Sequence, residues 1–264
     1  MLTVEQISGH FPLPLRQRNP RGMLVEYLQY ELLDSLFKNA AAAELSFIGG
    51  TAIRVLHDSP RFSEDLDFDN FGLSFPQFEE LLKTSCRDME YKGFLIEYRL
   101  VEKGAWHCYI RFPKILQEAG LSPDAERKIL IRIDSEAKEK LYDQNNVFLN
   151  RFSMYRQILA APAQILLAQK MMTILYRKRE KGRDIFDVSF LTGFAAPDFE
   201  YIKRTVGLDR SEFLRQFEER LGELDLNSLA RDVEPFLFAP EQRERVASFR
   251  DFWMGKRGPI GDSH

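Results

Sequence analysis

The chain has 264 residues, of which 44% are hydrophobic and 29% charged, and this balance excludes a wholly disordered protein, which lacks the apolar side chains to offset its ordering entropy. Its net charge of −3 excludes a general polyanion binder, and no apolar run approaches the ~20 residues that cross a bilayer. No secretory signal is recognisable at the N-terminus, and Cys86 and Cys108 have no metal-ligand spacing and are typical of reduced thiols. We therefore expect a cytoplasmic globular protein without membrane contact.

The first half of the chain mixes helical and strand patterns. Asn19-Pro20 is typical of a capped helix start, and leucines at helical spacing predict a helix that runs to about Lys38. Further patterns predict, in chain order, a strand over Leu45–Ile48, a helix over Thr51–His57, a strand over Asp65–Asp69, a helix over Pro76–Met89, and strands over Phe94–Val101, Trp106–Phe112 and Lys128–Asp134.

From about Pro162 the patterns become helical. They predict helices over Ala163–Lys178 and Asp184–Leu191, and then mostly helix with breaks at Pro197, Pro235 and Pro240. The sequence therefore predicts an α+β protein with two domains, residues 1–158 and residues 159–264.

Two acidic residues on one predicted strand carry the first chemical signal. Asp65 and Asp67 are two positions apart, so on a strand they face the same side, ~6–7 Å apart, while Leu66 and Phe68 point into the core. Like charges held this close raise each other's pKa unless a cation neutralises them. Mg²⁺, which prefers carboxylates, water and phosphates, is the natural cation.

A pair of glycines precedes these acids. Gly49-Gly50 ends a predicted strand and opens a predicted helix, so a phosphate could approach the backbone N–H groups of the helix N-terminus. The hydroxyl of Thr51 or Ser63 could add a donor. Together, the phosphate cradle and the acidic pair indicate a nucleoside triphosphate with Mg²⁺; a P-loop is excluded, because no Lys-Ser or Lys-Thr follows the glycines.

These residues also carry a family resemblance. Gly49-Gly50-Thr51-Ala52, followed by Arg61-Phe62-Ser63-Glu64-Asp65-Leu66-Asp67-Phe68, resembles the nucleotidyltransferase motif of the AbiEii/AbiGii toxin family, within the DNA polymerase β-like nucleotidyltransferase superfamily. Lys170, Arg177 and Arg183-Asp184-Ile185-Phe186-Asp187-Val188 resemble the later motif of that family. The two blocks span residues 47–191.

The resemblance implies a nucleotidyltransferase fold, a mixed sheet with flanking helices, followed by a helical C-terminal domain that closes over the nucleotide. It implies transfer of a nucleoside monophosphate from an NTP to an acceptor, with Mg²⁺ or Mn²⁺ bound. In this reading Asp65 and Asp67 hold two metal ions, and Gly49, Gly50, Thr51 and Ser63 hold the triphosphate, with Lys170 on its far side.

A third carboxylate on a neighbouring strand is also implied. Asp134 fits best, because Ile131 and Ile133 alternate with Arg132 and Asp134 as on a half-buried strand. Glu136 and Glu97 remain alternatives.

The later motif allows two interpretations. Arg177 could support Lys170, and Asp187 is favoured as a site residue that orients Lys170 or the incoming nucleophile, whereas Asp184 is either a second site acid or a helix N-cap. Residues 170–183 also carry six cations against Glu180 alone, which makes this segment a possible RNA contact.

The family resemblance implies a bacterial toxin with an antitoxin partner, and RNA, above all the 3′ end of tRNA, as the acceptor. Two other functions stay open: a nucleotide-binding sensor without turnover, and a kinase-like phosphotransferase that acts on protein.

Overall fold

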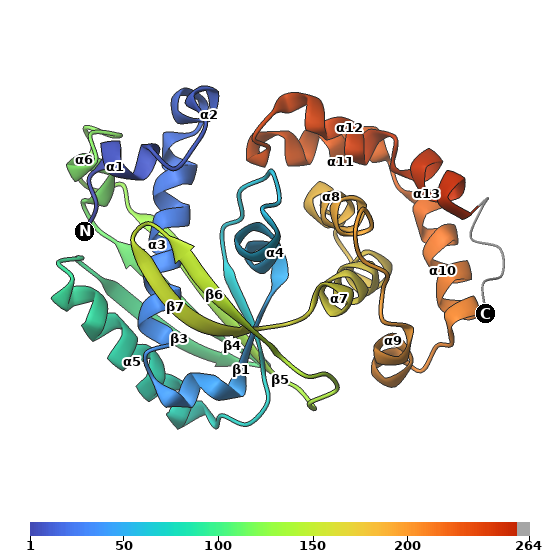
Figure 1. The fold of residues 1–264 in the computed structure, drawn as a ribbon, viewed down its shortest axis with the longest axis horizontal. Coiled ribbons are helices and arrows are strands. Elements are labelled where there is room, and N and C mark those ends of the chain that lie inside the picture. The colour runs from blue at the N-terminus through green and yellow to red at the C-terminus, as the bar shows by residue number, and fades with distance from the viewer. Residues whose placement is uncertain (258–264) are drawn as a thin grey trace. The chain divides into compact units, whose positions relative to one another are not determined.

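A computed structural model describes the backbone of residues 1–257 and the side chains of residues 1–255. It contains two compact units: Met1–Asp58 with Phe62–Ala161 form unit 1, and Ser59–Arg61 with the chain from Pro162 onward form unit 2. Figure 1 follows the chain through both. The short segment 59–61 thus belongs with the helical unit. The division into domains 1–158 and 159–264 stays a prediction.

Unit 1 is built on a seven-stranded sheet with the order β3-β4-β5-β2-β1-β7-β6. The pairs β2–β5 and β1–β7 are parallel and the other neighbours are antiparallel. The strands are β1 (Leu45–Ile48), β2 (Leu66–Asn70), β3 (Glu97–Lys103), β4 (Ala105–Phe112), β5 (Ile129–Ala137), β6 (Asn145–Arg151) and β7 (Met154–Ala160). The predicted mixed sheet with flanking helices is confirmed.

The helices of unit 1 include two long ones that pack against the sheet and against each other. They are α1 (Val4–Ser8), α2 (Leu13–Arg18), α3 (Pro20–Leu36), α4 (Gly49–His57), α5 (Phe75–Tyr91), α6 (Ile115–Glu118) and the 3₁₀ helix Ala40–Glu44. Helix α3 is buried along almost its whole length. Its buried Glu26 is paired with Arg54 of α4 at 2.9 Å and with Arg151 of β6 at 3.0 Å, as a buried charge requires.

The sheet has one apolar face and one polar face. Leu66 and Phe68 of β2 are buried as predicted, and so are Ile131 and Ile133 of β5. On β4, Trp106 packs against the rings of Phe75 and Phe78 from α5. Because side chains alternate along a strand, the residues between these lie on the opposite, polar face, and that face contains the predicted acids.

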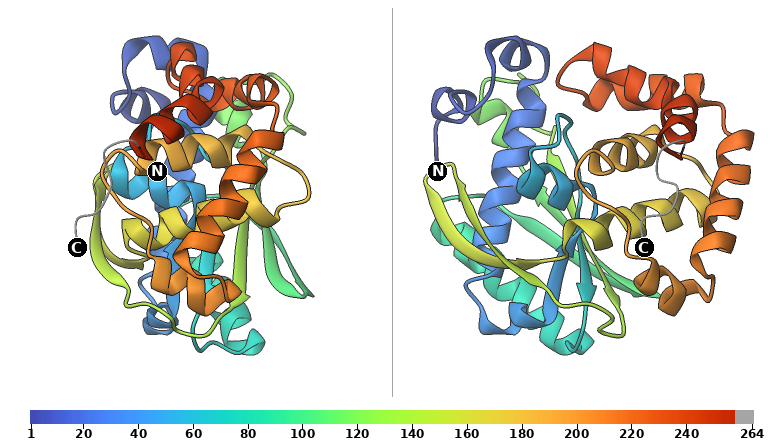
Figure 2. Two further views of the ribbon diagram at one scale, coloured as in Figure 1. Left: turned by 90° about the vertical axis from the view of Figure 1, so that its right-hand side faces the viewer. Right: turned by 45° about the vertical axis from the view of Figure 1, so that its right-hand side comes forward.

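The hairpin β6–β7, yellow-green in Figure 2, was not predicted from the sequence. Its turn consists of Phe152 and Ser153, both with positive φ angles, 54° and 61°. Two consecutive positive φ angles suit a tight hairpin turn, but glycine or asparagine usually occupies such positions. The turn therefore has no signal in the sequence.

Unit 2 is helical, as predicted. Its helices are α7 (Ala163–Tyr176), α8 (Gly182–Leu191), α9 (Phe199–Val206), α10 (Arg210–Glu223), α11 (Leu226–Val233), α12 (Glu244–Ala247) and α13 (Phe249–Arg257), with 3₁₀ turns Glu234–Phe236 and Pro240–Arg243. At Gly182 a Cβ atom would lie 1.9 Å from the carbonyl oxygen of Leu229, so only glycine permits this approach of α8 to α11.

Helix α8 begins two residues earlier than predicted. Its N-cap is Lys181, so Asp184 lies in the first turn and is not the N-cap that one interpretation proposed. In residues 1–257, no helix combines the length and the apolar character needed to cross a membrane.

Candidate functional site

Asp67 and Asp134 are direct neighbours in the sheet. The parallel strands β2 and β5 pair these two residues, and both side chains lie on the polar face, half-buried. Asp65 comes one residue before β2 rather than inside a strand as expected. Its carbonyl oxygen accepts a hydrogen bond from the hydroxyl of Thr51, which holds this segment against α4.

The sheet register separates the three acids that could serve as the third carboxylate. Glu136 pairs with Asp69, one step further along the strands, and Glu97 lies on β3, with β4 and β5 between it and β2. Asp134 is therefore the acid beside Asp67.

Two basic side chains contact these carboxylates. Arg132 Nη2 lies 3.1 Å from Asp65 Oδ2, and Arg132 Nε lies 2.8 Å from Asp134 Oδ2. Partial burial alone would lower the pKa of Arg132, but Asp65, Asp134 and Asp67 together raise it. His107 Nδ1 is 2.7 Å from Asp134 Oδ1. Arg132 and His107 thus hold the carboxylates in position.

The glycines lie directly against the acidic pair. Gly49 has a φ angle of +79°, and a Cβ atom built there would lie 2.2 Å from Asp67 Oδ2. Helix α4 starts at this residue, with Ile48 as its N-cap and no capping side chain. The first backbone N–H groups of α4 are therefore not used by a cap, and an uncapped helix N-terminus favours an anion.

The two predicted hydroxyl donors differ in their environment. Thr51 is fully buried, and its hydroxyl is engaged with Asp65 as described above, so it positions the chain and is not free to bind a phosphate. Ser63 is half-buried, and its carbonyl oxygen accepts a hydrogen bond from Gln29.

In unit 2, Lys170 lies between two acids of the later motif. Its Nζ atom is 3.0 Å from Asp184 Oδ1 and 2.9 Å from Asp187 Oδ2, and Arg177 also pairs with Asp184. Asp187 is thus in direct contact with Lys170, and its role in orienting that lysine stays a prediction.

Arg61 completes this cluster and was not singled out from the sequence. Its Nε atom donates to Asp187 Oδ1 at 2.7 Å, and the guanidinium makes a second hydrogen bond to the same carboxylate. Arg61 is 1% exposed and Asp187 is 0% exposed. Backbone pairing of Arg61 with Leu237 holds the segment 59–61 in the helical unit.

The charges in this cluster stabilise one another. Burial alone would raise the pKa of Asp184, but Lys170 and Arg177 hold it below its usual value. Burial would likewise lower the pKa of Lys170, whereas Asp187 and Asp184 raise it. Both groups are therefore charged at neutral pH.

The chain matches the family model described as nucleotidyl transferase AbiEii toxin, type IV toxin-antitoxin system, over residues 31–256. The chain belongs to this family. The nucleotidyltransferase motifs quoted above lie inside the matched region, and the toxin-antitoxin system implies an antitoxin partner.

Two solved structures from H. pylori match the chain. One, described as a candidate nucleotidyltransferase, is 15% identical, with a TM-score of 0.55, and covers 92% of this chain and 99% of its own. The other, the protein JHP933, is 14% identical, with a TM-score of 0.49, and covers 92% of this chain and 98% of its own. At these identities the first supports the fold alone. No curated protein matches the chain.

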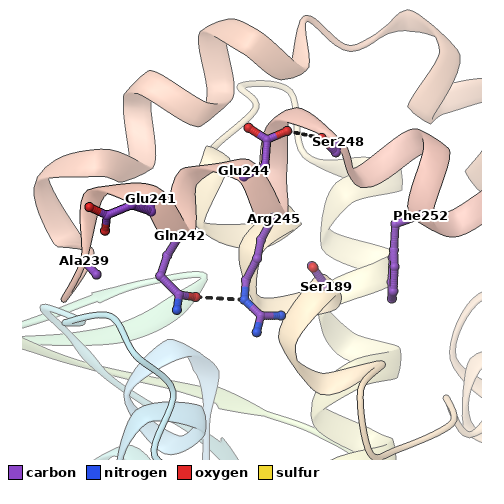
Figure 3. Close-up of a pocket in the computed structure, with 8 residues that line it drawn as sticks. All are labelled: Ser189, Ala239, Glu241, Gln242, Glu244, Arg245, Ser248 and Phe252. Atoms are coloured by element: carbon purple, nitrogen blue, oxygen red, sulfur yellow. Dashed lines mark hydrogen bonds between the residues drawn. The ribbon is translucent and has the colours of Figure 1, made fainter.

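No predicted site residue lines the pocket drawn in Figure 3. This pocket of about 460 Å³ lies in unit 2 and is lined by Ser189, Ala239, Glu241, Gln242, Glu244, Arg245, Ser248 and Phe252. Arg245 donates to Gln242 at 2.9 Å.

Three basic residues of the site were missed from the sequence: Arg132, His107 and Arg61. Arg132 and His107 alternate with buried residues on predicted strands, a pattern that could have indicated the polar face. Only the strand register shows that they contact Asp134. Arg61 lies in the quoted motif, but its partner Asp187 is distant in the sequence.

Proposed function

We propose that this protein is a Mg²⁺-dependent nucleotidyltransferase that transfers a nucleoside monophosphate from an NTP to RNA, with the 3′ end of tRNA as the acceptor. One observation carries the proposal: the carboxylate of Asp67 lies beside Asp134 and against Gly49, at the uncapped N-terminus of α4. The carboxylates that would bind the metal therefore lie next to the helix N-terminus that would bind the phosphate. The reaction would take place in the cytoplasm.

The donor set fits a hard cation. Three carboxylates, Asp65, Asp67 and Asp134, lie on or next to neighbouring strands, and two of them already share one positive group, Arg132. In their present positions, no group of three His, Cys, Asp or Glu residues within the described part of the chain is arranged as a metal site. These three residues would hold Mg²⁺ once Asp65 and Asp134 turn from Arg132. Bound there, Mg²⁺ would supply charge stabilisation for the phosphoryl group under attack.

The protein's own groups would position the nucleotide. The N–H groups of Gly49 and Gly50 would bind phosphate oxygens, helped by the dipole of α4. Lys170 would contact the triphosphate as a point charge, with Asp187 setting its direction. Arg177 would support Lys170 through their shared partner Asp184. Ser63 would offer its hydroxyl to a phosphate, and Thr51 would fix the Asp65 segment.

Incubation of the purified protein with each NTP, labelled at its α-phosphate, Mg²⁺ and total bacterial RNA tests the proposal. We expect a labelled RNA band and release of pyrophosphate, and both should disappear with Asp67→Asn. The exposed Glu136→Gln on β5, two residues beyond Asp134, is the matched control and should keep full activity.

Other outcomes identify the rival functions. In a parallel incubation with NTP labelled at its γ-phosphate, a labelled protein with release of a nucleoside diphosphate would indicate a kinase-like phosphotransferase. Binding of NTP without any product would indicate a sensor. Full activity of a correctly folded Asp67→Asn variant would overturn the proposed site.

A further inference from the structure

The polar face of β3, β4 and β5 bears a row of basic and aromatic side chains that leads to the acidic site. Cross-strand pairing places Arg99 of β3 opposite Tyr109 of β4, and Tyr109 opposite Arg132 of β5. Arg132 in turn contacts Asp65 and Asp134. The row therefore runs from the outer edge of the sheet, where β3 is the terminal strand, to the proposed metal ligands.

Most of the cations along this row lack an acidic partner. Lys103 shares the face of Arg99, and Arg111 shares the face of Tyr109. Arg99, Lys103 and Arg111 make no ion pair with any residue that the structure describes. Outside the acidic site, two acids of the same face are already paired: Glu97 with Lys128 at 2.9 Å, and Glu136 with Lys138 at 2.9 Å.

We infer that this face binds the acceptor RNA as a single strand whose 3′ end reaches Asp65 and Asp67; the inference rests on the proposed function. Unpaired arginines match the charge of phosphates. Tyr109, half-exposed between Arg99 and Arg132, offers a stacking surface to a base, in the way that β-sheet faces bind unpaired nucleotides.

The dimensions agree with a short strand of RNA. Neighbouring strands are ~4.8 Å apart, and β2, which follows Asp65, is the third strand from β3 across the sheet. Arg99 on β3 is therefore roughly 15 Å from β2. A few nucleotides span this distance. The protein therefore contacts only the end of the acceptor on this surface, with Arg99 and Arg111 at phosphates and Tyr109 at a base.

The inference is tested by measuring the affinity of the full-length protein for a short single-stranded RNA, labelled at its 5′ end, over a series of salt concentrations. We expect the double variant Arg99→Glu, Arg111→Glu to bind at least tenfold more weakly. The slope of log affinity against log salt should decrease by about 1.4, because two contacts to a single strand are lost. Tyr109→Leu should weaken binding about five- to hundredfold with an unchanged slope.

The matched control is Lys83→Glu, Arg87→Glu, which makes the same charge change on the exposed side of α5, beyond the opposite face of the sheet. RNA binding of this control should equal that of the parent. Equal loss in both double variants would show a non-specific charge effect and overturn the inference. Undiminished RNA binding by Arg99→Glu, Arg111→Glu would also overturn the inference. If Lys178→Glu, Lys181→Glu abolished RNA binding in that case, the basic segment 170–183 would be the RNA contact instead.

Nucleotide binding separates this inference from the proposed function. The Arg99→Glu, Arg111→Glu variant should bind NTP as the parent does and show a raised KM for RNA. If it transfers nucleotides to RNA with the parent's KM, the acceptor surface is wrong, while the proposed function stands. If RNA binding falls as expected but the parent transfers nothing, the surface is correct and the proposed function is wrong.

Discussion

At the scale of single residues, the contact between Gly49 and Asp67 joins two chemical elements of the site. The glycine begins a helix whose N-terminus favours an anion, and its missing side chain leaves room for a carboxylate that suits a cation. Any larger residue would compete with Asp67 for the same space, so this glycine is required for a steric reason in addition to its backbone conformation.

Gly49→Ala should therefore abolish activity. The new Cβ atom would lie 2.2 Å from Asp67 Oδ2, so the carboxylate must move, and the positive φ angle adds a strain of ~1 kcal/mol. Gly207→Ala is the control: its φ angle is +76°, but a Cβ atom there meets nothing within 4 Å. Thermal unfolding should show a loss of stability in both variants, larger in Gly49→Ala because of the added overlap with Asp67, and nucleotide transfer should be lost in Gly49→Ala alone.

A second prediction concerns the third carboxylate. Asp134→Asn should reduce transfer by several orders of magnitude, because metal-borne charge stabilisation contributes several kcal/mol in the transition state. Its free energy of unfolding should change by only ~1 kcal/mol, since the ion pair with the half-exposed Arg132 is a weak one. Activity that stays at the parent's level in Asp134→Asn and disappears in Glu97→Gln would assign the role to Glu97.

At the scale of secondary-structure elements, a buried ionic cluster joins α7, α8 and the segment 59–61 within unit 2. Lys170 comes from α7, Asp184 and Asp187 from α8, and Arg61 from a loop that lies far away in the sequence. Charges removed from water are stable only with their partners in place. The cluster therefore makes the two helices and the loop one structural element.

Arg61→Met should destabilise the protein by about 3–5 kcal/mol, because it leaves the fully buried Asp187 with one partner instead of two. Chemical denaturation of the full-length chain measures this loss. Lys178→Met, which removes a charge from the exposed loop after α7, should stay within about 0.5 kcal/mol of the parent. A loss as small as this for Arg61→Met would show that the cluster contributes little to the fold.

The pKa shift of Asp184 predicts how this element responds to acid. Because the folded-state pKa lies below the usual value, the contribution of Asp184 is fully present above the unfolded pKa of ~3.9 and is lost as the pH falls further. The difference in free energy of unfolding between the parent and Asp184→Asn should thus be constant from about pH 6 to 5 and shrink toward pH 3. A difference that grows on acidification would contradict this assignment.

At the scale of the whole molecule, a metal ion that binds only the folded protein must stabilise it. Thermal unfolding of the parent should therefore shift upward with Mg²⁺ or Mn²⁺, and EDTA should remove both the shift and the activity. Asp67→Asn should show no shift. In the absence of metal, this variant should be as stable as the parent or more so, because one of several neighbouring negative charges is gone.

The sequence was sufficient to predict the features that depend on the spacing of residue types within one segment of the chain. The alternation around Leu66 and Phe68 predicted a strand with its acids on one face, and leucine spacing predicted α3. The motifs around Gly49 and Lys170 gave the family that the comparison confirmed. The hairpin β6–β7 could not be predicted, because Phe152 and Ser153 adopt turn conformations that their residue types rarely favour.

The sequence by itself thus determined the family, the fold class and the acidic and glycine motifs, because each follows from residue type and spacing along one segment. Only the tertiary structure decided that Asp134 is the neighbour of Asp67, that Arg132 joins Asp65 to Asp134, and that Arg61 binds Asp187. The physical reason is that these contacts depend on strand register and helix packing. Both are set by the burial of apolar side chains from the whole chain. The residue pattern of one segment does not indicate which distant segment will lie beside it.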